Sequence, residues 1–286
     1  MSSIIIFQVI LNGLAMGLIY SLTAAGFSLI YGQAGILFFA LGEVYMLGAI
    51  VTYVLNAGIG VPYIIAVAIS TGGLGIFGVL LERYFFHFLE SENALTYAFA
   101  SLALGMLIAG IVLELFGEQG KAIEAPVSGV LNIYGVILTK DKLLVIIIAL
   151  LIISFLHLFF KFTKIGRAIR AVSQDEDAAE LVGVSLASTK ALTFFLALST
   201  AGAAGGLIAP LFYVDAFMAG PTLMTTLIVV VLGGLGSFVG AISGGLFIGL
   251  VQSFGYTFVG GIMSLITFIV TIIVLLVKPE GLFGHE

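Results

Sequence analysis

One carboxylate stands out among the residues that could do chemistry. Glu43 is the only acidic or basic side chain between Met1 and Leu81, and it lies in an apolar stretch beside Gly42 and close to Tyr45. An ionisable group at membrane depth is costly, so it normally faces protein or water and marks a solute or ion path. Two interpretations stay open: a solute or proton site, or a structural carboxylate that is hydrogen-bonded to neighbouring backbone.

No set of residues typical of an enzyme or a metal site occurs in the sequence. His87 and His157 are isolated, cysteine is absent, and there is neither a Ser-His-Asp nor a His-Glu-x-x-His arrangement. The string GEQGKA lacks the first glycine and the hydroxyl residue of a phosphate-binding loop. We therefore predict no catalytic residue, no metal and no cofactor on this chain. If ATP drives its activity, ATP binds to partner subunits.

A polar segment, GRAIRAVSQDEDAAELVGVSLASTKAL, predicts a short helix between two apolar regions. Ser173 followed by Glu176 fits a capping box, and Gly183 can supply the left-handed residue that ends a helix. The expected helix spans 174–182, with Ala178 and Leu181 on one side. A helix this short is marginal in water and needs a packing partner. Either it packs on its own membrane domain or it docks into a groove of another protein.

Two glycine clusters interrupt apolar segments that would otherwise be uniform spans. They are YGQAGILFFALGEVYMLGAI and LGGLGSFVGAISGGLFIGL. Substrate sites of transporters often lie where broken helices meet, although small residues also serve ordinary helix packing. No repeat is recognisable at the level of residues. The candidate residues of a translocation pathway are Phe39, Gly42, Glu43, Gly233, Gly234 and Gly236.

The elements that must position these residues are membrane-spanning helices. Hydrophobic residues make up 61% of the 286 residues, charged residues 9%, and the mean hydropathy is +1.28. Runs such as LLVIIIALLIISFL do not alternate in polarity, which excludes barrel strands. We predict an all-α polytopic membrane protein, a single domain over 1–286, with about eight or nine transmembrane helices, some of them short or broken at glycines. The expected spans are 4–31, 34–56, 61–81, 94–116, 143–160, 190–211, 221–235, 239–256 and 260–277.

Basic residues predict the orientation. Five of the ten lysines and arginines lie in 161–190, which places this loop in the cytoplasm by the positive-inside rule. The loop 117–142 is then expected outside and the C-terminus inside. The net charge of −5 does not suggest a nucleic-acid partner.

Four sequence blocks resemble the permease subunits of branched-chain amino acid ABC importers. They are GILFFALGEVYMLGA, GRAIRAVSQDEDAAELVGVSLASTKALTFFLA, VVVLGGLGSFVGAISGGL and KPEGLFG. The resemblance implies an inner-membrane permease with a related or identical second permease, two cytoplasmic ATPases and an external solute-binding protein. It also implies that the cytoplasmic segment couples to the ATPases. The residues expected to do so are Gly166, Arg167, Arg170, Ser173, Glu176, Ala178, Leu181 and Gly183.

The chain departs from this family at two positions. Phe38 and Leu41 stand where the family commonly has Asn and His, whereas Gly35, Ala40, Gly42 and Glu43 match its pattern. The departure leaves the solute open: branched-chain or other amino acids, or urea and short amides. A secondary transporter or channel that works without ATP is a further alternative, but it would leave the predicted cytoplasmic helix unexplained.

Overall fold

The computed structural model describes residues 3–89, 93–124, 126–127, 129–133, 136–260, 263–278 and 281. Seven helical stretches in these ranges are long and apolar enough to cross a membrane, and two shorter apolar helices accompany them. They correspond to the nine expected spans, so the all-α membrane fold is confirmed. Most of the terminal block KPEGLFG lies outside the described residues.

The first part of the chain forms four spans. Helix α1 (Ser3–Ala34) is followed by a non-helical segment, 35–40, and by α2 (Leu41–Tyr53), which ends in a π-helical turn, η1 (Val54–Gly58). Helix α3 (Tyr63–Leu81) continues through η2 (Glu82–Phe86) and η3 (His87–Leu89), so it extends beyond the predicted end at residue 81. Helix α4 (Ala94–Phe116) completes this part.

The second part contains a hairpin and a helix, α6 (Lys164–Gln174), that the sequence did not predict. A hairpin of β1 (Val130–Ile133) and β2 (Val136–Thr139) leads directly into α5 (Lys140–Phe162). Two short helices, α6 and α7 (Glu176–Leu181), precede α8 (Leu186–Ile208). The chain ends with α9 (Ala219–Gly233), α10 (Phe238–Phe258) and α11 (Met263–Val277).

Helix α8 lies at the centre of the bundle, in contact with α1, α2 and α3. Its glycines allow the backbones to meet. A Cβ atom on Gly202 would lie 2.5 Å from Leu74 Cδ1 on α3, and one on Gly205 would overlap the carbonyl oxygen of Tyr45 on α2. Close approach through small residues is the main way in which helices associate in a membrane.

The two ends of the chain pack in the same pattern. Helix α1 packs on α10, and in the same way α8 packs on α3. The next helix in each half, α2 or α9, follows a non-helical segment, 35–40 or 209–218. Helix α4 contacts α2 as α11 contacts α9. Five crossings precede α8, so α8 runs through the membrane in the direction opposite to α1. The fold is therefore an inverted repeat, the organisation found in many transporters.

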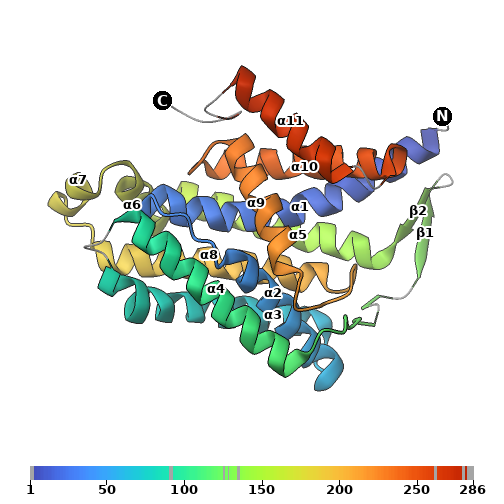
Figure 1. The fold of residues 1–286 in the computed structure, drawn as a ribbon, viewed down its shortest axis with the longest axis horizontal. Coiled ribbons are helices and arrows are strands. Elements are labelled where there is room, and N and C mark those ends of the chain that lie inside the picture. Colours follow the sequence, from blue (N-terminus) through green and yellow to red (C-terminus); the bar gives the residue numbers. More distant parts are fainter. Residues whose placement is uncertain are drawn as a thin grey trace.

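The polar segments lie at opposite ends of the molecule. In Figure 1 the spans run roughly along the long axis, with α6 and α7 at one end and the β1–β2 hairpin at the other. This arrangement agrees with the prediction that 161–190 and 117–142 face opposite sides of the membrane.

Candidate functional site

The polar segment between α5 and α8 folds as two helices instead of one. Thr163 caps α6, because its Oγ1 accepts a hydrogen bond from the backbone N–H of Gly166 at 2.9 Å. Gly166 lies against α5, where a Cβ atom would be 2.6 Å from the carbonyl oxygen of Phe159. Ile169 and Val172 are buried, which gives α6 an apolar face against the bundle.

The predicted start of the short helix was wrong. Ser173 lies inside α6, where its hydroxyl donates to the carbonyl of Arg170, and Asp175 caps α7 by accepting from Ala178 N at 2.9 Å. Serine and aspartate are equally good N-caps, so the sequence could not distinguish them. The predicted end was correct: Gly183 has φ +87°, and Val184 N donates to Ala179 O as in a Schellman motif.

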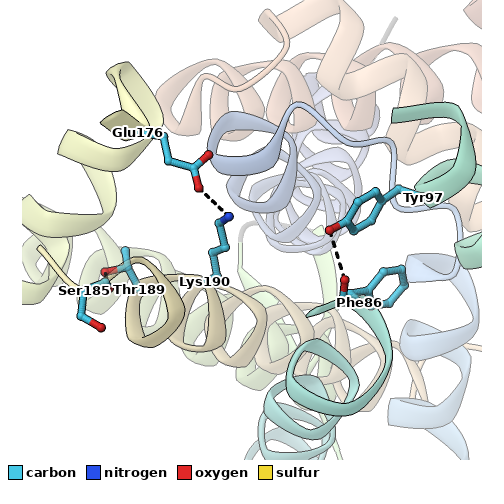
Figure 2. A network of polar contacts seen from close by, with 6 residues as sticks. All are labelled: Phe86, Tyr97, Glu176, Ser185, Thr189 and Lys190. Carbon is cyan, nitrogen blue, oxygen red and sulfur yellow. Dashed lines mark hydrogen bonds and ion pairs between the residues drawn. The ribbon is translucent and has the colours of Figure 1, made fainter. Parts of the chain in front are cut away.

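An ion pair joins α7 to α8. Glu176, expected to reach back to the helix start, instead lies 2.5 Å from Lys190 Nζ, as Figure 2 shows. Lys190 follows a well-anchored first turn of α8, in which Thr189 Oγ1 donates to the carbonyl of Ser185. The first turn of α7 is therefore tied to the central helix of the bundle.

The outer side of α7 carries an apolar edge. Leu181 is 89% exposed and Val182 is 80% exposed, while Ala178 is also exposed; the buried residue of this helix is Ala179. Arg167 and Arg170 are exposed on the adjoining α6. Within the part of the chain that the structure describes, nothing covers this edge, so Leu181 is available to another protein.

Glu43 lies in the first turn of α2 and faces α4. A Cβ atom on Gly105 would lie 3.0 Å from Glu43 Oε2, which is buried and has no hydrogen-bond partner among the described residues. Helix α4 also supports the preceding segment, because Ser101 Oγ accepts from Phe39 N at 3.0 Å. A carboxylate in the first helical turn interacts favourably with the helix dipole. The unpartnered Oε2 does not decide between a structural carboxylate and a solute or proton site, so both interpretations of Glu43 remain predictions.

The candidate glycines lie where helices meet or turn. A Cβ atom on Gly42 would lie 2.6 Å from the carbonyl oxygen of Ala219, and Gly233 lies directly against Gly240. Gly234 and Gly236 have φ of +104° and +79° in the turn between α9 and α10. Helix packing and this turn account for these four residues, and their role in a pathway remains a prediction.

A large cavity with both polar and apolar walls lies elsewhere, between α1, α10, the start of α5 and the segment that follows α8. Its volume is about 700 Å³, within the usual range for small-molecule sites. The polar side chains that line it come from distant parts of the chain: Asn12, Tyr20, Thr139, Asp141, Lys142, Gln252, Ser253, Tyr256 and Thr257. Tyr20 donates to Gln252 Oε1 at 2.8 Å, and Lys142 donates to Asn12 Oδ1 at 2.7 Å.

A smaller cavity of about 240 Å³ lies next to it. Met16, Tyr20 and Phe212 line both cavities, and the smaller one extends to Tyr45 on α2 and to Thr222 on α9. Glu43 lines neither cavity. The two cavities together reach the place where the paired helices α2 and α9 meet.

Sequence comparison shows the family of the chain. The family described as branched-chain amino acid transport system / permease component matches residues 9–277. The chain belongs to this family. The permease is 30% identical to the high-affinity branched-chain amino acid transport system permease protein BraD of Pseudomonas aeruginosa, over 97% of this chain and 95% of that protein. It is 28% identical to the corresponding protein LivH of Escherichia coli, with the same coverage. No solved structure matches it significantly.

The permease is therefore a multi-pass protein of the inner membrane and a permease component of an ABC-type transporter, not an enzyme. Sequence reasoning missed the polar side chains of its large cavity. A signal was present, because Asn12 and Gln252 are amides inside otherwise apolar spans. Amides at such depth usually have a structural or functional partner.

Proposed function

We propose that this permease imports branched-chain amino acids, driven by ATP that partner subunits bind. Two ATPases, a second permease, related or identical, and an external solute-binding protein would complete the importer. BraD and LivH, which this chain matches over nearly their full length, are named as permeases for branched-chain amino acids, and this supports the substrate class. This chain would supply the path through the membrane and the contact that links it to the ATPases.

The large cavity is the observation that carries the solute path. An amino acid is a zwitterion with a short side chain, and the cavity offers one charge of each sign, Asp141 and Lys142. Ala15, Met16 and Leu211 provide apolar surface in the same cavity. A solute that enters here would pass Tyr20 towards Tyr45 and Thr222 in the smaller cavity.

The departures at Phe38 and Leu41 do not favour urea or amides. Both side chains are 1% exposed. Phe38 packs in an aromatic cluster, with ring centroids 5.6 Å from Phe86 and 5.8 Å from Phe194. These residues stabilise the core around the broken segment, and they contact neither cavity. The presence of apolar Phe38 and Leu41 in place of the family's Asn and His therefore carries no information about the solute.

Lys142→Gln tests the solute path. We expect uptake of radiolabelled leucine by the complete importer to fall about tenfold, because a charge-assisted hydrogen bond contributes roughly 1.5–3 kcal/mol. The ATPases should still co-purify. Lys140→Gln removes the same charge two residues earlier, outside the cavity, and should leave uptake near normal. Equal uptake by both variants would reject the proposed path, and competition by urea in place of valine would reject the substrate class.

Motion of the ATPases would reach the membrane helices through the Glu176–Lys190 ion pair. Glu176→Lys and Lys190→Glu should each lower uptake several-fold, because each places like charges side by side where the wild type has a 2.5 Å pair. Association with the ATPases should persist, because the apolar edge at Leu181 is unchanged. The double variant, which carries both Glu176→Lys and Lys190→Glu, should recover part of the lost uptake. No recovery would mean that the pair does not transmit the ATPase motion.

A further inference from the structure

A second cavity with a different chemistry lies at the α6 end of the molecule. It has a volume of about 360 Å³ and is enclosed by α1, α5, α6 and α10. His157 and Lys161 reach it from one face of α5, four residues apart, and Arg170 reaches it from α6. No acidic side chain is among the described residues that line it. The cavity therefore favours an anion.

The positive charges at this cavity are not neutralised within the described chain. Neither Lys161 nor Arg170 forms an ion pair there; Lys161 Nζ lies 5.4 Å from the ring centre of Phe162. Both side chains are exposed, so an anion can approach without displacing a protein partner.

A buried hydroxyl also borders the cavity. Ser28 on α1 is 2% exposed, and its Oγ has no hydrogen-bond partner among the described residues. Buried hydroxyl groups are normally hydrogen-bonded, because leaving one unsatisfied is costly. Ser28 can donate this hydrogen bond to an oxygen atom of a ligand in the cavity.

The exposed face of α5 beside the cavity-lining residues His157 and Lys161 is apolar. Along α5, large side chains are exposed up to the end of the helix: Leu151, Phe155, Leu158 and Phe162. Lys161 and Phe162 close this membrane-spanning helix, so the basic cavity lies at the level where the hydrocarbon region gives way to headgroups. A ligand that matches both surfaces has a phosphate group and acyl chains.

We propose that this cavity binds the phosphate headgroup of an anionic phospholipid, whose acyl chains lie along α5. Arg170 and Lys161 neutralise the phosphate, and Ser28 donates a hydrogen bond to it. Basic pockets between membrane helices bind such headgroups in other proteins. The site is independent of the transported solute, and it places a lipid in contact with α6, within the segment expected to couple to the ATPases.

The test measures lipid retained by the full-length permease in its complete importer. The importer is exchanged into nanodiscs with equal phosphatidylglycerol and phosphatidylcholine, extracted, and analysed by native mass spectrometry. We expect the wild type to retain phosphatidylglycerol preferentially. Lys161→Gln and Arg170→Gln should each reduce this retention about fivefold, the usual effect of one basic residue near an anionic lipid surface. Ser28→Ala should reduce it as well, without a change in charge.

Lys164→Gln is the matched control, because Lys164 is exposed on α6 and does not line the cavity. It should retain lipid as the wild type does. Equal losses for Lys161→Gln and Lys164→Gln would show general surface attraction and overturn the proposal. Displacement of the lipid by millimolar inorganic phosphate would show a site for a free anion instead. Disulfide formation between two His157→Cys copies would show that a second permease covers the cavity, which also overturns it.

Discussion

Leu181→Asp is expected to abolish solute uptake and association with the ATPases together. Leu181 is 89% exposed at the end of α7 and belongs to the apolar edge that we propose docks on a partner. Burying an unpaired carboxylate in that contact would cost several kcal/mol, which is more than 100-fold in affinity at about 1.4 kcal/mol per factor of ten. The measurement is co-purification of the ATPases with tagged permease, alongside uptake of radiolabelled leucine.

The permease itself should remain folded in this variant, because the side chain contacts no span. Ala187→Asp is the control: it adds the same charge at an exposed position in the first turn of α8, where a carboxylate suits the helix dipole. This variant should keep both solute uptake and association with the ATPases. A Leu181→Asp importer that retains its ATPases and normal uptake would mean that the coupling contact lies elsewhere.

The second large effect is expected from Gly205→Val. Any Cβ at this position overlaps the carbonyl oxygen of Tyr45 and lies 2.9 Å from the backbone nitrogen of Ala49. Both obstacles are backbone atoms, so no side-chain rotation can relieve the overlap. Helices α8 and α2 would have to separate in the middle of the bundle, which costs more than the usual 1–3 kcal/mol of overpacking. We expect no monodisperse protein in size-exclusion chromatography.

Gly205→Ala and Gly110→Ala make the comparison quantitative. Both glycines lie inside spans, but a Cβ on Gly110 meets nothing within 4 Å. Gly110→Ala should leave the melting temperature unchanged or raise it, since alanine favours a helix over glycine by about 1 kcal/mol. Gly205→Ala should lower it clearly. Similar melting temperatures for the two variants would contradict the close packing of α8 on α2.

Hydropathy predicted the spans because each one is a local property of about 20 residues. It could not predict the β1–β2 hairpin, whose strands have only four residues each. The inverted repeat was also invisible. The two halves share the pattern of helix contacts, but different residues make these contacts. Gly202 of α8 lies against Leu74 of α3, whereas Gly245 of α10 lies against Ser21 of α1.

The sites were predictable to different degrees. The short helix α7 was predicted, although its start was misplaced, because caps and helix length are encoded locally around 173–183; its role in coupling stays a prediction. The large cavity was missed because it depends on residues that are far apart in the chain: Tyr20 and Gln252, which share a hydrogen bond, are separated by 232 positions. Glu43 attracted attention as a lone charge, yet its neighbourhood on α4 became visible only through the packing of Gly105.

The central position of α8 has a mechanical consequence. Fifteen residues separate Lys190, at the ion pair, from Gly205, at the backbone contact with α2; at about 1.5 Å per residue this is roughly 22 Å of helix. Where backbones touch, there are no long side chains to repack and absorb a displacement. We therefore expect α8 to move as a rigid rod, so that a tilt at its Lys190 end would also displace α2 beside Tyr45.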